Sequence, residues 1–301
     1  MLGHHVRATT RVERAGSWVS VLQPISESEE ESIDRFQRVV GTRLDASPLA
    51  LMLDIDGTLA PIAPTPERAM VPRATREVLR RLAVLPEVIV ALITGRSAED
   101  ALRMADLPGL WIIGSHGLEL RTPAGELSAS PEAHRYRPAV AAAAEKLGPA
   151  AAAVAGAIIE DKTWSLCLHY RLVNPGDVPE LKRHAHLAAD ETGLRVMEGK
   201  MMVELRPPVN IDKGTAAVAL SDRLGVGPDA SLLCAGDDRT DEDAFRALRR
   251  RYPRVVTVRV LSDGDRGDGT TDAELTLRST EQLRRVLELL AARREASALR
   301  A

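Results

Sequence analysis

The chain has 301 residues, of which 45% are hydrophobic and 28% charged, values typical of a soluble globular protein. The net charge of −3 excludes the strongly basic surface of a nucleic-acid-binding protein. No apolar stretch is long enough to cross a membrane, and the N-terminus lacks the apolar segment of a secretory signal. Two cysteines, each inside an apolar run, indicate buried free thiols, so we expect a cytoplasmic protein.

Residues 1–48 are predicted to be an N-terminal extension that is partly helical or disordered. The first 25 residues carry no clear pattern and are expected to be disordered. A helix is predicted over 30–44, with five apolar side chains directed inward: Ile33, Phe36, Val39, Val40 and Leu44.

From Leu49 onward, apolar strands alternate with helices. Strands are predicted at 49–55, 88–93 and 110–113, and a helix starts at Pro72 after the first of them. This alternation predicts a doubly wound α/β fold with a parallel sheet.

Between 121 and 206 the pattern changes, because strands and helices are segregated rather than alternating. Helices are predicted at 139–147 and 179–192, paired strands within 157–171, and a hairpin over 195–205. This composition predicts an α+β module inserted into the first domain.

The parallel pattern then resumes and continues to the end of the chain. The predicted strands are 231–235, 255–260 and 275–277, and the predicted helices are 213–224, 240–250 with Thr240 as its cap, and 281–294. The predicted core is therefore discontinuous, 49–120 plus 207–301, around an insert at 121–206.

The sequence Asp54-Ile55-Asp56-Gly57-Thr58 directly follows the first predicted strand. The carboxyl ends of strands in an open α/β sheet form a ligand-binding crevice, and alternation puts both carboxylates on one side of the strand. Two acids that point the same way repel each other and favour a cation, and their oxygen ligands suit Mg²⁺. The alternative is a solvated acidic turn.

Two further motifs lie at a strand end and a helix start. Thr94-Gly95-Arg96 follows the second predicted strand, where a hydroxyl and backbone N–H groups can cradle a phosphate. Lys213 opens a helix, where its ammonium would offset the charge of a transferring phosphoryl group. Taken singly, a lysine at a helix start is more often a solvated surface residue.

The run Gly236–Glu242 contains four acids, a cluster of like charge that is costly unless a metal or solvent offsets it. Asp237 or Asp238 can complete the metal site begun by Asp54, and Asp241 can support it. The alternative is an acidic helix N-terminus. Together the motifs predict phosphoryl transfer, in which one carboxylate attacks phosphorus and a second donates a proton to the leaving oxygen.

With these motifs in this order, the sequence resembles the haloacid dehalogenase superfamily, whose Rossmann-like core carries an inserted cap. Within it, the chain resembles the trehalose-6-phosphate phosphatase family more closely. The supporting segments are Gly114-Ser115-His116-Gly117-Leu118-Glu119, Glu160-Asp161-Lys162, His169-Tyr170-Arg171, Gly199 to Pro207 and Gly236 to Glu242. The resemblance covers about 49–290 and leaves out the N-terminal extension.

The resemblance implies a role for each matching residue. It implies Asp54 as nucleophile and Asp56 as general acid and base, with Thr94 and Lys213 holding the phosphoryl oxygens. It implies that Mg²⁺ is bound by Asp54, by Asp237 and by the backbone carbonyl of Asp56, with Asp238 and Asp241 nearby. It also implies a cap that binds the sugar hydroxyls through Glu160, Arg171, Lys200 and Glu204. Arg96, in the phosphate cradle, and His116, at the domain junction, are further candidates to bind substrate.

The resemblance therefore predicts magnesium-dependent hydrolysis of trehalose 6-phosphate through a phospho-aspartate. Two alternatives stay open: a phosphatase for sucrose phosphate or mannosyl-phosphoglycerate, and a non-catalytic regulatory module of a trehalose-phosphate synthase complex. A phosphoryl-receiver domain also has an acid-rich strand end and a later lysine. The size of the chain and its Asp-x-Asp-Gly-Thr motif argue against the receiver. The expected partners are a small sugar phosphate and a trehalose-phosphate synthase, not nucleic acid or membrane, and we expect a monomer.

Overall fold

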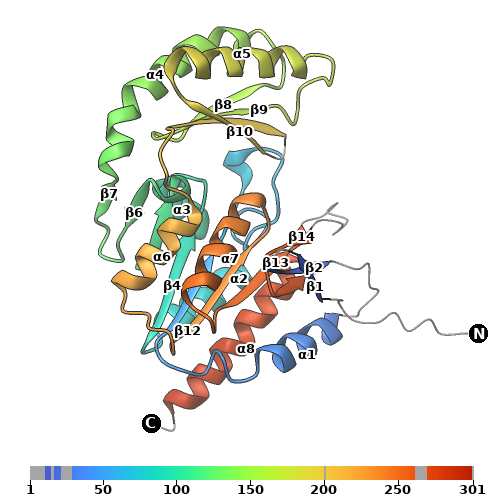
Figure 1. Cartoon of the computed structure of the whole chain (residues 1–301), viewed down its shortest axis with the longest axis vertical. Helices are drawn as coiled ribbons and strands as arrows, with labels where there is room; N and C mark the ends of the chain where they lie inside the picture. Colours follow the sequence, from blue (N-terminus) through green and yellow to red (C-terminus); the bar gives the residue numbers. More distant parts are fainter. Residues whose placement is uncertain (1–10, 15–16, 22–28, 200, 262–269, 300–301) are drawn as a thin grey trace, which may run out of the picture.

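The computed structural model describes residues 11–14, 17–21, 29–199, 201–261 and 270–299. Its strands form one sheet of eight strands, one of four and one of three. Figure 1 shows the four-stranded sheet stacked on one end of the eight-stranded sheet, with α4 (Pro131–Ala152) and α5 (Val178–Thr192) beyond it. We call residues 131–206, which contain this small sheet and its two helices, the lid.

The eight-stranded sheet is parallel over six strands and ends in an antiparallel pair. Its order is β15 (Leu275–Leu277), β13 (Val256–Val260), β12 (Ser231–Gly236), β3 (Leu49–Leu53), β4 (Val88–Ile93), β5 (Trp111–Gly114), β6 (Glu119–Arg121) and β7 (Leu127–Ala129). The chain runs outward from β3 in one direction and from β12 in the other. The two neighbours β3 and β12 thus mark the topological switch point, where open α/β sheets bind ligands.

Helices cover both faces of this sheet. One face carries α1 (Glu29–Val40), α2 (Arg73–Ala83), α3 (Ala98–Ala105) and α8 (Thr280–Ala298), and the other carries α6 (Lys213–Arg223) and α7 (Arg239–Arg251). Side chains of β3 alternate between the two cores: Leu49, Leu51 and Leu53 pack on the first, Ala50 and Met52 on the second. Because β3 is buried on both faces, it is apolar throughout. The predicted doubly wound α/β fold is confirmed.

The lid sheet is antiparallel, in the order β10 (Arg195–Gly199), β11 (Met202–Arg206), β9 (Leu166–His169) and β8 (Ile158–Asp161). Alternate side chains, among them Leu166, Leu168, Val203 and Leu205, form an apolar core with α4 and α5. The side chains at the intervening positions of each strand therefore face the large sheet. Among the described helices, none is long and apolar enough to cross a membrane.

The N-terminal part of the chain contains more structure than its composition suggests. β1 (Arg11–Arg14) and β2 (Ser17–Val21), in the segment predicted to be disordered, form a hairpin that pairs with β14 (Thr270–Thr271). This pairing joins distant parts of the chain, so local composition does not reveal it. Within α1, Phe36 and Val40 are buried as predicted, but Val39 is 41% exposed and the prediction for it was wrong.

Three other details differ from the predictions. β7 lies within the predicted insert at 121–206 but pairs with β6, so this hairpin extends the large sheet before the lid begins. α4 is longer than predicted because Ser130 caps it and its two internal prolines do not end it. α7 is capped by Asp238, not Thr240, since the Asp238 carboxylate accepts hydrogen bonds from the N–H groups of Thr240 and Asp241. Short 3₁₀ turns complete the fold, η1 at Pro66–Arg68 and η2 at Ser115–Gly117.

Candidate active site

Three buried carboxylates meet at the switch point of the large sheet. Asp54 follows β3, Asp237 follows β12 and Asp241 lies in the first turn of α7, and one oxygen from each lies within 4.8 Å of the others. The strands are held in register up to this point, where the Asp54 N–H donates to the carbonyl of Ala235 over 3.0 Å. The sequence motifs at two strand ends thus form one cluster.

Two glycines allow the carboxylates to approach the backbone. Gly57 has a φ of +82°, and a Cβ there would lie 2.2 Å from Oδ2 of Asp237. A Cβ on Gly236 would lie 2.1 Å from Cγ of Asp241. Any side chain at either position would displace a carboxylate of the cluster, which explains why glycine stands beside the acids in both motifs.

Lys213 links two of the carboxylates. Its Nζ donates to Oδ1 of Asp54 over 2.7 Å and to Oδ1 of Asp241 over 2.8 Å. Burial would lower the pKa of this ammonium, but the carboxylates of Asp241 and Asp54 raise it well above its usual value. The lysine is therefore a fixed positive charge beside Asp54, not the solvated surface residue considered above.

Backbone groups also hold the acids of this site in place. Oδ2 of Asp241 accepts the N–H groups of Asp237 and Asp238 over 3.0 and 3.1 Å, which fixes its orientation. Asp238 is the N-cap of α7, and its Oδ1 accepts the Thr240 N–H over 2.8 Å. Asp241 and Asp238 therefore hold the loop after β12 in place.

The charge balance of the cluster suits a divalent cation. Burial raises the pKa of Asp54 to about 7, an effect that Lys213 opposes and that the carboxylates of Asp237 and Asp238 reinforce. Asp54 therefore lies beside further carboxylates that oppose its ionisation. Carboxylate oxygens are the ligands that Mg²⁺ uses in proteins, so the residues present fit this ion.

Asp56 lies outside that cluster and forms an ion pair with Arg96. Nε of Arg96 donates to Oδ2 of Asp56 over 2.6 Å, and Nη2 donates to Oδ1 over 2.8 Å. Arg96 is in turn held by Oδ2 of Asp100 at 2.5 Å and by the carbonyl of Pro66 at 3.1 Å. The backbone N–H of Arg96 also donates to Oγ1 of Thr94 over 3.2 Å. Arg96 thus organises Asp56, a role that sequence reasoning did not assign to it.

A cavity of about 520 Å³ separates the carboxyl ends of the strands from the lid. The predicted site residues that line it are Asp54, Asp56, Thr94, Arg96, His116, Lys213, Asp237 and Asp238 from the core, and Glu160, Arg171 and Glu204 from the lid. Asp241 is not among the lining residues because it lies behind, bonded to Lys213. Lys200 falls outside the described residues. The structure therefore brings the two predicted groups, on core and lid, to opposite walls of one cavity.

On the lid wall, Glu204 is buried among polar groups. Its carboxylate lies 2.6 Å from Oγ of Ser165, 3.1 Å from Nε2 of His116 and 3.7 Å from Nζ of Lys162. Burial opposes its ionisation, but Lys162 and then His116 hold its pKa well below the usual range. Glu204 is thus an anionic acceptor fixed at the junction of core and lid.

Lys162 and His169 also line the cavity, and sequence reasoning assigned neither of them a role. Lys162 is buried, and burial would lower the pKa of its ammonium, yet Glu204 raises it well above its ordinary value. A signal was present in the sequence, because Lys162 and His169 lie two residues from Glu160 and Arg171, the spacing of side chains on one face of a strand.

The fold and the site together define the class of protein to which the chain belongs. The switch-point carboxylates, the lysine at the start of α6 and the inserted lid are arranged on a fold shared with solved haloacid dehalogenase-like hydrolases. A model of the trehalose-phosphatase family matches residues 52–281, and the chain belongs to this family.

The chain is also similar to individual proteins. A Mycobacterium leprae trehalose-phosphate phosphatase is 36% identical over 258 residues, covering 82% of this chain and 58% of that protein. A Mycobacterium tuberculosis protein described as an uncharacterized glycosyl hydrolase is 40% identical over 226 residues, covering 74% of this chain but 17% of its own length. A crystal structure of a trehalose-6-phosphate phosphatase related protein has a TM-score of 0.69 at 26% identity, covering 81% of this chain and 97% of that one. The chain thus spans less than two thirds of the length of these two curated relatives.

Proposed function

We propose that the protein hydrolyses trehalose 6-phosphate to trehalose and phosphate, with Asp54 as the nucleophile and Mg²⁺ as cofactor. The observation that carries the proposal is the position of Asp54, at the floor of the cavity, bonded to Lys213 and beside Asp237. Family membership supports the reaction, and the relatives named as trehalose-phosphate phosphatases support the substrate.

In the first half of the reaction, a carboxylate oxygen of Asp54 attacks phosphorus and the bond from phosphorus to the sugar oxygen breaks. Asp56 donates a proton to that oxygen, and trehalose leaves. Lys213 stays within reach of the transferring group and offsets its negative charge.

In the second half, Asp56, now a carboxylate, takes a proton from water. The water oxygen attacks phosphorus, the bond to Asp54 breaks and phosphate leaves. Mg²⁺, when held by Asp54, the Asp56 carbonyl and Asp237, supplies positive charge that stabilises the phosphoryl oxygens. Arg96 pairs with both oxygens of the Asp56 carboxylate, the form that takes the proton from water, and so holds it in position.

The lid supplies selectivity in this proposal. Glu160, Arg171 and Glu204 face the cavity from its far wall, where the second glucose unit of the substrate would lie, and Lys200 completes the predicted set. Polar side chains that hydrogen-bond to sugar hydroxyls discriminate against substrates without those hydroxyls, because the side chains are then left without hydrogen-bond partners. A trehalose-phosphate synthase remains a predicted partner.

The direct test is phosphate release from a panel of sugar phosphates with Mg²⁺. Trehalose 6-phosphate should give the highest kcat/KM, ahead of sucrose 6-phosphate, mannosyl-phosphoglycerate and glucose 6-phosphate. Asp54→Asn measures the background from any contaminating phosphatase. A higher kcat/KM for another sugar phosphate would reassign the substrate, and absence of release from the whole panel would favour a regulatory module.

A further inference from the structure

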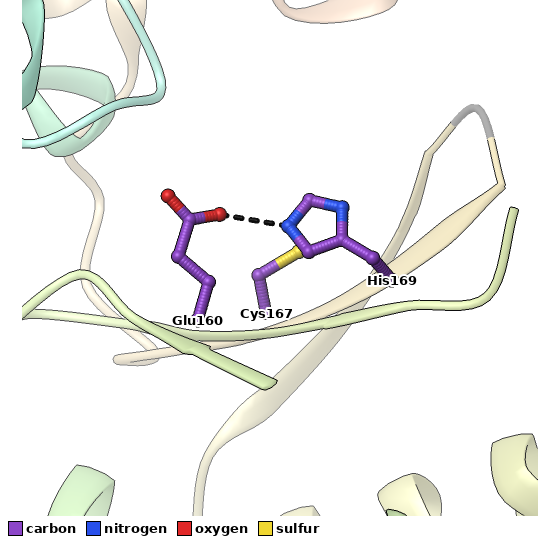
Figure 2. A group of neighbouring side chains, drawn as sticks. All are labelled: Glu160, Cys167 and His169. Carbon is purple, nitrogen blue, oxygen red and sulfur yellow. Dashed lines mark hydrogen bonds and ion pairs between the residues drawn. The ribbon is translucent and has the colours of Figure 1, made fainter. Parts of the chain in front are cut away.

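A second group of metal-ligating side chains lies in the lid, apart from the carboxylate cluster. Glu160 on β8 and Cys167 and His169 on β9 each present one ligand atom, and these atoms lie within 4.8 Å of one another. Figure 2 shows the carboxylate and the imidazole turned toward each other with the thiol beside them. Oε2 of Glu160 lies 2.7 Å from Nε2 of His169.

The strand register fixes this arrangement. Glu160 pairs directly with Cys167 across β8 and β9, and His169 follows two residues later on the same strand. All three side chains therefore project from one face of the sheet. Their neighbours Leu166 and Leu168 point to the opposite face, into the apolar core of the lid. The three ligands are thus placed by a packed sheet and not by a loop.

The donor set selects a particular kind of metal. Thiolate, imidazole and carboxylate are ligands of Zn²⁺, whereas Mg²⁺ prefers oxygen ligands alone. Ligand atoms around a tetrahedral Zn²⁺ lie about 3.5 Å apart, so shifts of about 1 Å would bring these three into place. Glu160 and His169 line the cavity, which leaves the fourth position of the metal open toward the substrate.

The charged side chains around Glu160, Cys167 and His169 permit a cation to bind there. Burial raises the pKa of the Cys167 thiol and Lys162 opposes that rise, so metal binding has to release the thiol proton. The ammonium of Lys162 is itself offset by Glu204, 3.7 Å away. The side chains of Glu160 and His169 are 21% exposed, which gives an ion access from the cavity.

We propose that Glu160, Cys167 and His169 form a Zn²⁺ site in the lid. The bound ion engages the Glu160 carboxylate and occupies the sugar end of the cavity, so Zn²⁺ inhibits the enzyme at a place distinct from the Mg²⁺ site. The metal site stands on the three side chains alone, while the inhibition rests on the proposed function.

The site is tested with Co²⁺ as a spectroscopic probe, in the presence of excess Mg²⁺ to fill the carboxylate cluster. Native protein should show thiolate-to-cobalt charge-transfer absorption that Zn²⁺ abolishes by displacement. Cys167→Ala should lack this absorption, and Cys234→Ala, which removes the other buried thiol, should keep it. His169→Gln should weaken Co²⁺ affinity at least about 10-fold. Absence of the absorption in native protein, or its persistence in Cys167→Ala, would overturn the site.

Inhibition is measured separately. Zn²⁺ should inhibit trehalose 6-phosphate hydrolysis by native protein and by Cys234→Ala, and Cys167→Ala should require at least about 10-fold more Zn²⁺. Equal inhibition of all three would disprove the blocking role. If trehalose 6-phosphate is not a substrate, the cobalt spectra still decide the metal site.

Discussion

Glu204 in the lid hydrogen-bonds to His116 in the core, with Oε2 and Nε2 3.1 Å apart and both side chains buried. Nδ1 of His116 is buried and has no hydrogen-bond partner among the described residues. The pair therefore connects the two walls of the cavity. It ties the position of the lid to a group that faces the substrate.

Glu204→Gln should destabilise the protein at neutral pH by about 3 kcal/mol, because it leaves the buried ammonium of Lys162 without its carboxylate. The folded protein holds the pKa of Glu204 well below its ordinary 4.5, so its ionisation adds stability above that pH. This contribution is lost as the pH falls through the folded-state pKa. The difference in stability between native and variant should thus narrow in acid.

Denaturant unfolding at a series of pH values checks this prediction. Glu198→Gln is the matched control, since Glu198 lies on the neighbouring strand β10 with its side chain 52% exposed. It should change stability by less than about 1 kcal/mol. Equal stability of native protein and Glu204→Gln at neutral pH would show that the buried pair is not a stabilising contact.

Arg96→Ala should lower kcat by about 10-fold to 100-fold, because it removes both hydrogen bonds that orient Asp56 for proton transfer. Arg103→Ala is the matched control. Arg103 also bonds Asp100, over 2.6 Å, but it does not line the cavity. Steady-state kinetics should show near-native kcat for Arg103→Ala, and a comparable loss in both variants would assign the effect to Asp100 and not to Asp56.

Glu160→Gln should lower kcat/KM for trehalose 6-phosphate by at least about 10-fold, because a lid carboxylate that accepts from sugar hydroxyls is replaced by a weaker acceptor. Turnover of an aryl phosphate, which does not reach the lid, should change less than about 3-fold. Parallel assays on the two substrates measure this ratio. If turnover of the two substrates falls by the same factor, Glu160 acts on the chemistry or the fold and not on selectivity.

Chelation should stop the reaction. Excess EDTA is expected to abolish phosphate release, and added Mg²⁺ should restore it, since Asp54, Asp237 and Asp241 form the kind of carboxylate cluster that binds this ion. Circular dichroism before and after chelation serves as the control for folding. An unchanged rate in EDTA would mean that the carboxylate cluster works without a divalent ion.

Much of the fold could be predicted from local patterns. β4 spans Val88–Ile93 as predicted, because a strand buried on both faces has to be continuously apolar. The carboxylates of Asp54 and Asp237 could be expected at one place, since the carboxyl ends of parallel strands share an edge of the sheet. In both cases the apolar run that predicts the feature lies in the strand itself or directly before the residue concerned.

The features that sequence reasoning missed depend on contacts between distant segments. The hairpin of β1 and β2 pairs with β14, and Arg96 binds Asp56 across 40 residues. Lys162 is buried because Glu204, on another strand, faces it. Neither composition nor periodicity specifies which distant charges meet, so the partners of these residues could not be predicted.

The central claim is that Asp54 forms the bond to phosphorus. Native protein mixed with trehalose 6-phosphate and Mg²⁺, quenched in acid and digested, should yield a phosphorylated peptide, and fragmentation by mass spectrometry should locate the phosphoryl group on Asp54. Asp54→Asn should yield no such peptide and release no phosphate. A phosphoryl group on another residue, or near-native turnover by Asp54→Asn, would contradict the account.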